Sequence, residues 1–114
     1  MPILKIKTNV DIAPSNQSYL LGTISSAVAD MLSKPERYVM ITLEPSTAML
    51  SGGSDAPLAY LELKSLGLPE DQTSQYSKKL CDLIGHQLGI DQDRIYIEFS
   101  SPARHLFGWD GRTF

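Results

Sequence analysis

The sequence predicts a single α+β domain over residues 1–114, in which two βαβ repeats form a four-stranded mixed sheet with two helices on one face. Segments 3–8 and 60–65 align with the same alternation of apolar and polar residues, which is typical of half-buried strands. The same offset superposes apolar residues at helical spacing: Ile24, Ala27 and Met31 on Cys81, Ile84 and Leu88. The chain therefore reads as two similar units, together long enough to bury one core.

The first unit is expected to contain a strand over 2–8, a helix over 15–32 and a strand over 38–44. Pro14 followed by Ser15 or Asn16 is typical of a helix start, because proline is tolerated in the first turn. Alternating apolar residues define both strands.

The second unit is expected to contain a strand over 58–66, a helix over 70–88 and a strand over 95–100. Gly52 and Gly53 predict a turn between the halves. Pro69 ahead of two acidic residues favours a helix start, and Gly89 suits a helix end. The closing strands of the two units alternate out of phase by one residue, so the repeat is approximate there.

Alternation gives the predicted sheet two unequal faces. The face toward the helices would carry Leu4, Ile6, Val39, Ile41, Leu43, Leu61, Leu63, Ile95, Ile97 and Phe99. The opposite face would carry Ile3, Tyr38, Met40, Leu58, Tyr60 and Tyr96 beside Lys5, Lys7, Glu62 and Glu98. That is more apolar area than a lone domain leaves in water, so we expect another copy of the chain to cover it, with apolar residues of the tail 106–114 adding contact surface.

Composition narrows the function classes. A net charge of -3 offers no basic stripe for nucleic acid. The single cysteine, Cys81, excludes an internal disulfide and fits a reducing compartment. The start of the chain lacks the features of a signal peptide, and no apolar run reaches membrane-spanning length. We expect a cytoplasmic protein without membrane or nucleic-acid partners, although secretion without a signal peptide stays open.

Pro2 follows Met1 directly, and two interpretations are open from the residues alone. Proline is tolerated at the first residue of an edge strand. If Met1 is removed, however, Pro2 becomes a free secondary amine, and a terminal amine titrates near ~8, close enough to neutrality for a general base.

Motifs spread along the whole chain resemble the macrophage migration inhibitory factor family of the tautomerase superfamily. They are Met1-Pro2, Thr8-Asn9-Val10, Ser33-Lys34-Pro35, Gly52-Gly53-Ser54, Ser65-Leu66-Gly67, Tyr76-Ser77-Lys78, Asp93-Arg94-Ile95-Tyr96-Ile97 and Gly108-Trp109. The resemblance implies a homotrimer of such βαβ pairs, with active sites between neighbouring subunits.

The resemblance also implies an activity. Pro2 would act as base and then acid, interconverting keto and enol forms of aromatic α-keto acids such as phenylpyruvate, and possibly of dopachrome-like compounds, without a cofactor. The terminal amine must be neutral at rest, which burial and a nearby cation both favour. Independently of the resemblance, Asp82 and His86 are four residues apart on the second helix, which suits a surface charge pair, and His105 has no partner at metal-ligand spacing, so no metal site is expected.

By the same resemblance, Lys34 would hold the substrate carboxylate or the developing enolate, with Lys64 as a second cation near the mouth. Ser65 and Leu66 would mark the strand end where a backbone N–H holds a substrate oxygen. Without the resemblance, Lys34 reads as a solvated lysine near a helix end, and Ser65 as an ordinary strand terminus.

Tyr96 would enter from the adjacent subunit and donate its phenolic hydrogen. An aromatic surround for a planar ring is implied for Tyr38, Phe107, Trp109 and Phe114. Any of these aromatic residues could instead pack an interface. Glu98 departs from the family pattern, which has a neutral amide there, and an ionised carboxylate would favour protonated Pro2 and repel an anionic substrate unless Lys5 or Arg104 pairs with it.

The alternative function is a signalling or protein-binding trimer with weak or vestigial catalysis. Ile12 and Ser46 stand where family receptor recognition uses an arginine and an aspartate, and Leu58 and Leu61 replace the family's Cys-x-x-Cys. Both departures weigh against cytokine-like signalling and thiol chemistry. An inactive scaffold would result if Met1 stays attached, because the Pro2 nitrogen would then be a nonbasic amide.

Overall fold

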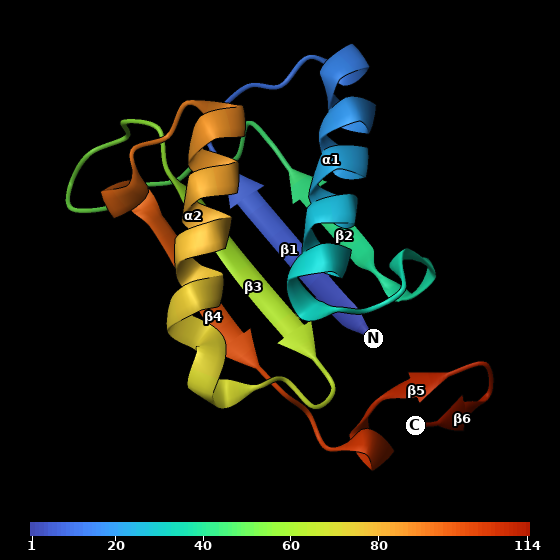
Figure 1. The fold of residues 1–114 in the computed structure, drawn as a ribbon. Coiled ribbons are helices and arrows are strands. Elements are labelled where there is room, and N and C mark those ends of the chain that lie inside the picture. The colour runs from blue at the N-terminus through green and yellow to red at the C-terminus, as the bar shows by residue number, and fades with distance from the viewer.

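The computed structural model describes residues 1–114 and arranges them as one sheet covered on one face by two helices (Figure 1). The elements in chain order are β1 (Pro2–Thr8), α1 (Pro14–Leu32), β2 (Met40–Glu44), β3 (Ala59–Ser65), α2 (Thr73–Leu88), β4 (Ile95–Ser100), β5 (Gly108–Trp109) and β6 (Arg112–Thr113). Single 3₁₀ turns occupy Glu36–Tyr38, Glu70–Gln72, Gln92–Arg94 and Arg104–Leu106. The β5–β6 hairpin lies apart from the sheet, beside the start of the chain (Figure 1).

The strand order β2-β1-β3-β4 confirms the predicted mixed sheet. β1 pairs with β2 and β3 pairs with β4 in parallel, whereas the two central strands β1 and β3 are antiparallel. Each parallel pair is joined through a helix, as a parallel connection requires. The two predicted βαβ units are therefore present and meet along β1 and β3.

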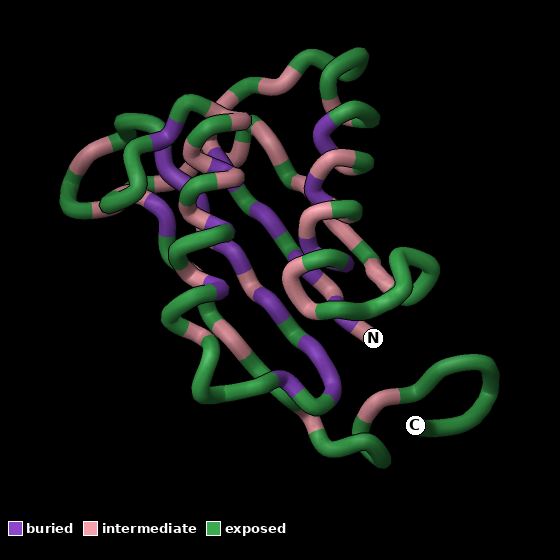
Figure 2. Tube along the Cα trace, viewed as in Figure 1, coloured by how far each residue is buried: buried purple, intermediate pink, exposed green.

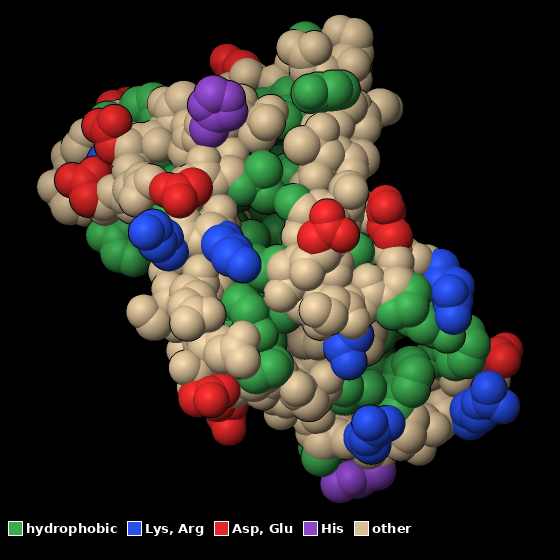
Figure 3. Space-filling model, in the orientation of Figure 1, with side chains coloured by type: hydrophobic (Ala, Val, Ile, Leu, Met, Phe, Trp, Pro, Cys, Tyr) green, Lys and Arg blue, Asp and Glu red, His purple; other side chains and the backbone are tan.

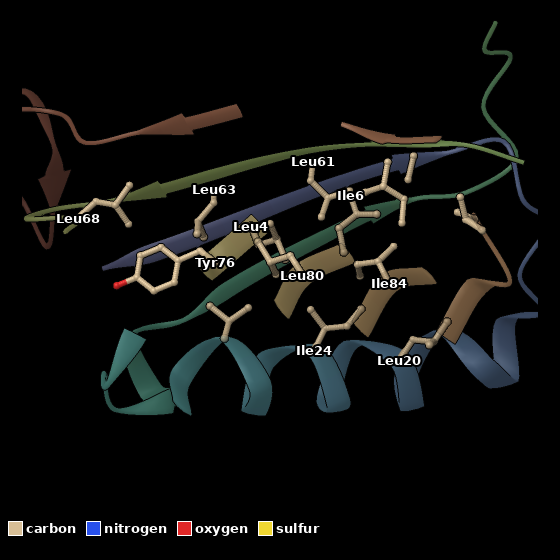
Figure 4. Close-up of a cluster of buried hydrophobic side chains, with 14 residues drawn as sticks. Leu4, Ile6, Leu20, Ile24, Leu61, Leu63, Leu68, Tyr76, Leu80 and Ile84 are labelled. Atoms are coloured by element: carbon tan, nitrogen blue, oxygen red, sulfur yellow. The ribbon is translucent and has the colours of Figure 1, made fainter. Parts of the chain in front are cut away.

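The core lies between the sheet and the helices, where side chains of β1 and β3 meet those of α1 and α2 (Figure 4). Buried segments follow the central strands and the inward helix faces (Figure 2). The predicted core face is confirmed, with Leu4, Ile6, Leu61, Leu63 and Ile95 buried and Val39, Ile41, Leu43, Ile97 and Phe99 packed against them.

Two elements begin two or three residues later than predicted, at Met40 and Thr73, in each case because a 3₁₀ turn comes first. Tyr38 lies in a turn rather than in the strand, because its N–H donates to the Pro35 carbonyl at 3.0 Å. The second long helix begins at Thr73, because Gln72 has a non-helical φ of -112° after the turn Glu70–Gln72.

Leu58 was predicted on the uncovered face and is instead buried, at 4% exposure. It precedes β3 in a segment held by side chains: Thr8 Oγ1 donates to the Leu58 carbonyl at 2.8 Å, and the Leu58 N–H donates to Asn9 Oδ1 at 3.0 Å. The guanidinium of Arg94 also donates to four carbonyls between residues 51 and 57. The predicted turn at Gly52 and Gly53 is confirmed, with φ values of 59° and 76°.

Two helical glycines provide a matched test of this packing. A Cβ at Gly85 would lie 2.8 Å from the Ile90 carbonyl oxygen, whereas a Cβ at Gly22 would meet nothing within 4 Å. Gly22→Ala should therefore stabilise the chain by up to about 1 kcal/mol, through helix propensity alone. Gly85→Ala should destabilise it by about 1–3 kcal/mol, through overpacking against backbone. Urea denaturation measures both, and a stabilising Gly85→Ala would show that this helix end is looser than described.

Candidate functional site

Pro2 lies at the start of β1 and is nearly inaccessible, with less than 2% of its surface exposed. It pairs with Ser65, the last residue of the antiparallel β3, which is itself 1% exposed. Leu66 follows directly and is 6% exposed. The central strand pairing therefore holds the start of the chain against the end of β3.

Lys34 reaches the same region from the end of α1. Ser33 adopts a left-handed conformation, with φ of 53°, and ends the helix. The Lys34 N–H then donates to the Ala29 carbonyl at 3.0 Å, an arrangement typical of a helix C-terminus. This turn fixes the backbone from which the Lys34 side chain extends.

The tail of the chain, residues 107–114, supplies the third wall of the same region. β5 and β6 pair across a tight turn at Asp110 and Gly111, both with positive φ. The Trp109 ring stacks on Phe114 with centroids 5.9 Å apart, and Phe107 contacts Phe114 at 5.7 Å. The Phe114 N–H donates to the Phe107 carbonyl at 3.1 Å, so these three aromatic side chains form one cluster.

These three parts line a cavity of about 340 Å³ that is open to solvent and is called here the terminal cavity. Its walls combine apolar and aromatic surface with two cations and contain no acidic residue. The lining residues are Met1, Lys34, Pro35, Tyr38, Leu66, Arg104, Trp109 and Phe114. A planar anion suits such a cavity, because aromatic faces pack a flat group while the cations attract its charge.

The terminal amine of Met1 shows what the cavity does to a base at this position. Burial, followed by the charges of Lys34 and Arg104, lowers the pKa of this amine from its ordinary value of 8.0. All three causes act in the same direction, because each disfavours the protonated form. The cavity therefore shifts the equilibrium of this amine toward its neutral form.

A second cavity of about 240 Å³ lies on the uncovered face of the sheet, called here the sheet cavity. Ile3, Lys5, Glu62, Lys64, Glu98 and Ser100 line it. The Tyr60 hydroxyl donates to Glu98 Oε2 at 2.6 Å, and this bond, the first of several causes, raises the pKa of Tyr60 to about 12. Within one chain, Glu98 and Lys64 thus lie in a different cavity from Lys34.

The predicted site residues fall into two groups. Lys34, Leu66, Tyr38, Trp109 and Phe114 line the terminal cavity, with Pro2 and Ser65 buried behind it and Phe107 supporting its aromatic wall. Tyr96, Lys64 and Glu98 lie on the uncovered sheet face, where Tyr96 is 54% exposed. Within one chain, the second group does not join the first.

Sequence reasoning missed Arg104 as a lining residue, since it was considered only as a partner for Glu98. Its 3₁₀ turn, Arg104–Leu106, carries no periodic signal, and only its closeness in sequence to Phe107 and Trp109 pointed to the site. The structure gathers no cluster of three His, Cys, Asp or Glu side chains that could hold a metal ion. Neither helix has the length and apolar character needed to cross a bilayer.

Comparisons with known proteins agree over the whole chain. The family model for macrophage migration inhibitory factor (MIF) matches residues 1–114. The macrophage migration inhibitory factor of Xenopus laevis is 35% identical, covering 100% of this chain and 99% of its own length. The homolog from Trichinella spiralis is 34% identical over the full length of both chains. The crystal structure of the homologue from Prochlorococcus marinus superposes with a TM-score of 0.90 at 39% identity, covering 98% of each chain.

The cavity's effect on the amine gives a direct prediction. Lys34→Gln should raise the pKa of the terminal amine, because it removes a positive charge that disfavours protonation. Lys79→Gln, on the outer side of the helices beside Asp30, is the matched control and should leave this pKa unchanged. NMR titration of the terminal residue measures both, and an unmoved pKa in Lys34→Gln would show that this lysine acts elsewhere.

Proposed function

This chain belongs to the macrophage migration inhibitory factor family, and we propose that it is a cofactor-independent keto–enol tautomerase that uses Pro2 as its general base and acid. The proposed substrates are aromatic α-keto acids of the phenylpyruvate type, and possibly dopachrome-like compounds. One observation carries the proposal: the start of the chain lies in a cavity whose burial and two cations favour a neutral amine.

Removal of Met1 would transfer this environment to the Pro2 nitrogen. Pro2 is already held by its pairing with Ser65, so the new terminus would be ordered rather than free in solvent. A buried secondary amine beside Lys34 and Arg104 would experience the same causes that lower the pKa of the Met1 amine. Its pKa would then lie below the ordinary value, which favours the unprotonated form that a general base needs.

The chemistry follows from this base. The Pro2 nitrogen takes a proton from the carbon next to the keto group, and the C–H electron pair becomes a C=C bond. The carbonyl π electrons move onto oxygen, where Lys34 stabilises the negative charge that develops. The protonated Pro2 nitrogen then returns this proton to the oxygen, which yields the enol and restores the neutral amine, and the reverse sequence yields the keto acid. No redox step is involved.

Assembly would complete the site. Tyr96 and Met40 are 54% and 48% exposed on the uncovered sheet face, which favours cover by other copies of the chain. In the proposed homotrimer, Tyr96 and Glu98 of one subunit would approach the terminal cavity of its neighbour. Tyr96 would donate its hydroxyl hydrogen to substrate, and Lys64 would lie near the shared mouth.

The first prediction concerns the base. Pro2→Ala in the processed protein should lower kcat/KM for phenylpyruvate tautomerisation by about 100-fold or more, the usual contribution of a positioned proton-transfer group. Processed protein, identified by intact mass, is compared with protein that retains Met1, which should be similarly inactive. Equal turnover by all three proteins would end the proline mechanism, whereas no turnover by any of them would favour the binding or signalling role.

The second prediction concerns Glu98. Glu98→Gln should raise kcat/KM for an anionic aromatic keto acid, because it removes a negative charge that opposes both neutral Pro2 and the substrate. The same change should lower the pKa of Tyr60 from about 12, which ultraviolet titration of tyrosine detects. A shifted Tyr60 pKa with unchanged kinetics and pH profile would mean that Glu98 lies outside the working site.

A further inference from the structure

Cations gather around the terminal cavity beyond the single lysine that binding one carboxylate requires. Lys34 and Arg104 line it directly. The Arg37 guanidinium lies 4.6 Å from the ring centroid of Tyr38, and that of Arg112 lies 5.6 Å from the ring centroid of Trp109. Figure 3 shows this region at the lower right, where hydrophobic side chains are surrounded by lysine and arginine. Four of the chain's ten lysine and arginine residues thus line this cavity or lie against its aromatic walls.

These cations are poorly neutralised within the chain. No aspartate or glutamate lines the cavity. The one ion pair joins Arg112 to Asp110 at 4.0 Å, with both side chains about two-thirds exposed, so water screens it strongly. Within one chain, Lys34 and Arg104 form no ion pair with an aspartate or glutamate, although the chain as a whole carries a net charge of -3. Within one chain, the residues that line this cavity therefore carry an excess of positive charge.

Among the side chains that one subunit contributes, a substrate with one carboxylate leaves one of the two lining cations without a counter-charge. We propose that the terminal cavity prefers planar substrates with two anionic groups: unsaturated or aromatic α-keto acids that carry a second carboxylate. The preference deepens the proposed tautomerase function and rests on it for the reaction, although binding tests it separately. Arg104 is then the residue that determines this specificity.

The two cations suit different parts of such a substrate. Arginine presents a planar fork that binds a carboxylate through two parallel hydrogen bonds, whereas lysine acts as a compact point charge. Lys34 would therefore stabilise the keto-acid end, where charge develops, and Arg104 would hold the remote carboxylate. The Trp109 and Phe114 rings, nearly parallel at an interplanar angle of 14°, form a flat wall for the conjugated part between them. Arg37 and Arg112 would add attraction during approach.

The test uses two inert planar probes, trans-cinnamate with one carboxylate and trans-4-carboxycinnamate with two. Calorimetry at low salt should give the dianion at least about tenfold tighter binding, and added salt should reduce the difference. Because Trp109 is the only tryptophan, its single indole N–H signal in NMR reports binding in this cavity. Arg104→Gln should weaken dianion binding by about tenfold and cinnamate by less than threefold, with Arg104→Lys intermediate and Lys79→Gln unchanged.

Three results would overturn the proposal. The first is equal affinity for the two probes. The second is an equal loss for both probes in Arg104→Gln, which would mean that the two cations share a single carboxylate. The third is a preference that emerges only in Glu98→Gln, which would mean that a neighbouring subunit neutralises the cavity. Pro2→Ala separates a failure of this proposal from a failure of the proposed function. If Pro2→Ala loses turnover, its preference for the dianion should remain intact. If it retains turnover, only the proposed reaction is contradicted.

Discussion

The antiparallel pairing of β1 with β3 is the constraint on which the rest of the molecule depends. It joins the two βαβ units into one sheet and carries the residues that both helices cover. The same ladder runs to its last pair, Pro2 with Ser65, and so buries the beginning of the chain instead of leaving it to fray. Chain termini are ordinarily mobile unless they are tied down in this way. The fold thus gives the start of the chain the fixed position that the proposed proton transfer requires.

Three segments that are distant in sequence surround the start of the chain. The end of α1 brings Lys34, the end of β3 brings Leu66, and the tail brings Arg104 with the aromatic hairpin. Burial and the two cations act together on the terminal amine, and both favour its neutral form. The same cations would attract an anionic substrate, so one electrostatic arrangement would serve both the proposed base and its proposed substrate.

Much of the fold could be predicted from sequence because its signals are local and repeated. Alternation identified the four main strands, and helical spacing identified the inward faces of α1 and α2. The prediction differed from the structure where side-chain hydrogen bonds or short turns set the backbone conformation, as at Leu58 and Tyr38. The β5–β6 hairpin went unpredicted as a strand pair because each strand has only two residues, too few for a period.

The site was predictable only in part, for a related physical reason. Family motifs mark Lys34, Leu66 and Trp109, whose side chains line one cavity. Arg104 follows no motif, and its role emerges only when the tail folds back beside Met1. Tyr96 lies on the open face of the sheet, so the role proposed for it depends on assembly rather than on one chain.

The central claim is that the terminal cavity keeps the Pro2 nitrogen unprotonated at rest. The most direct measurement is a pH titration of protein labelled with ¹⁵N-proline, after mass spectrometry has verified that Met1 is absent. The account predicts that this nitrogen titrates well below the same imino group in an unfolded chain, and that denaturant restores the ordinary value. An imino group that titrates identically in folded and unfolded protein would contradict it.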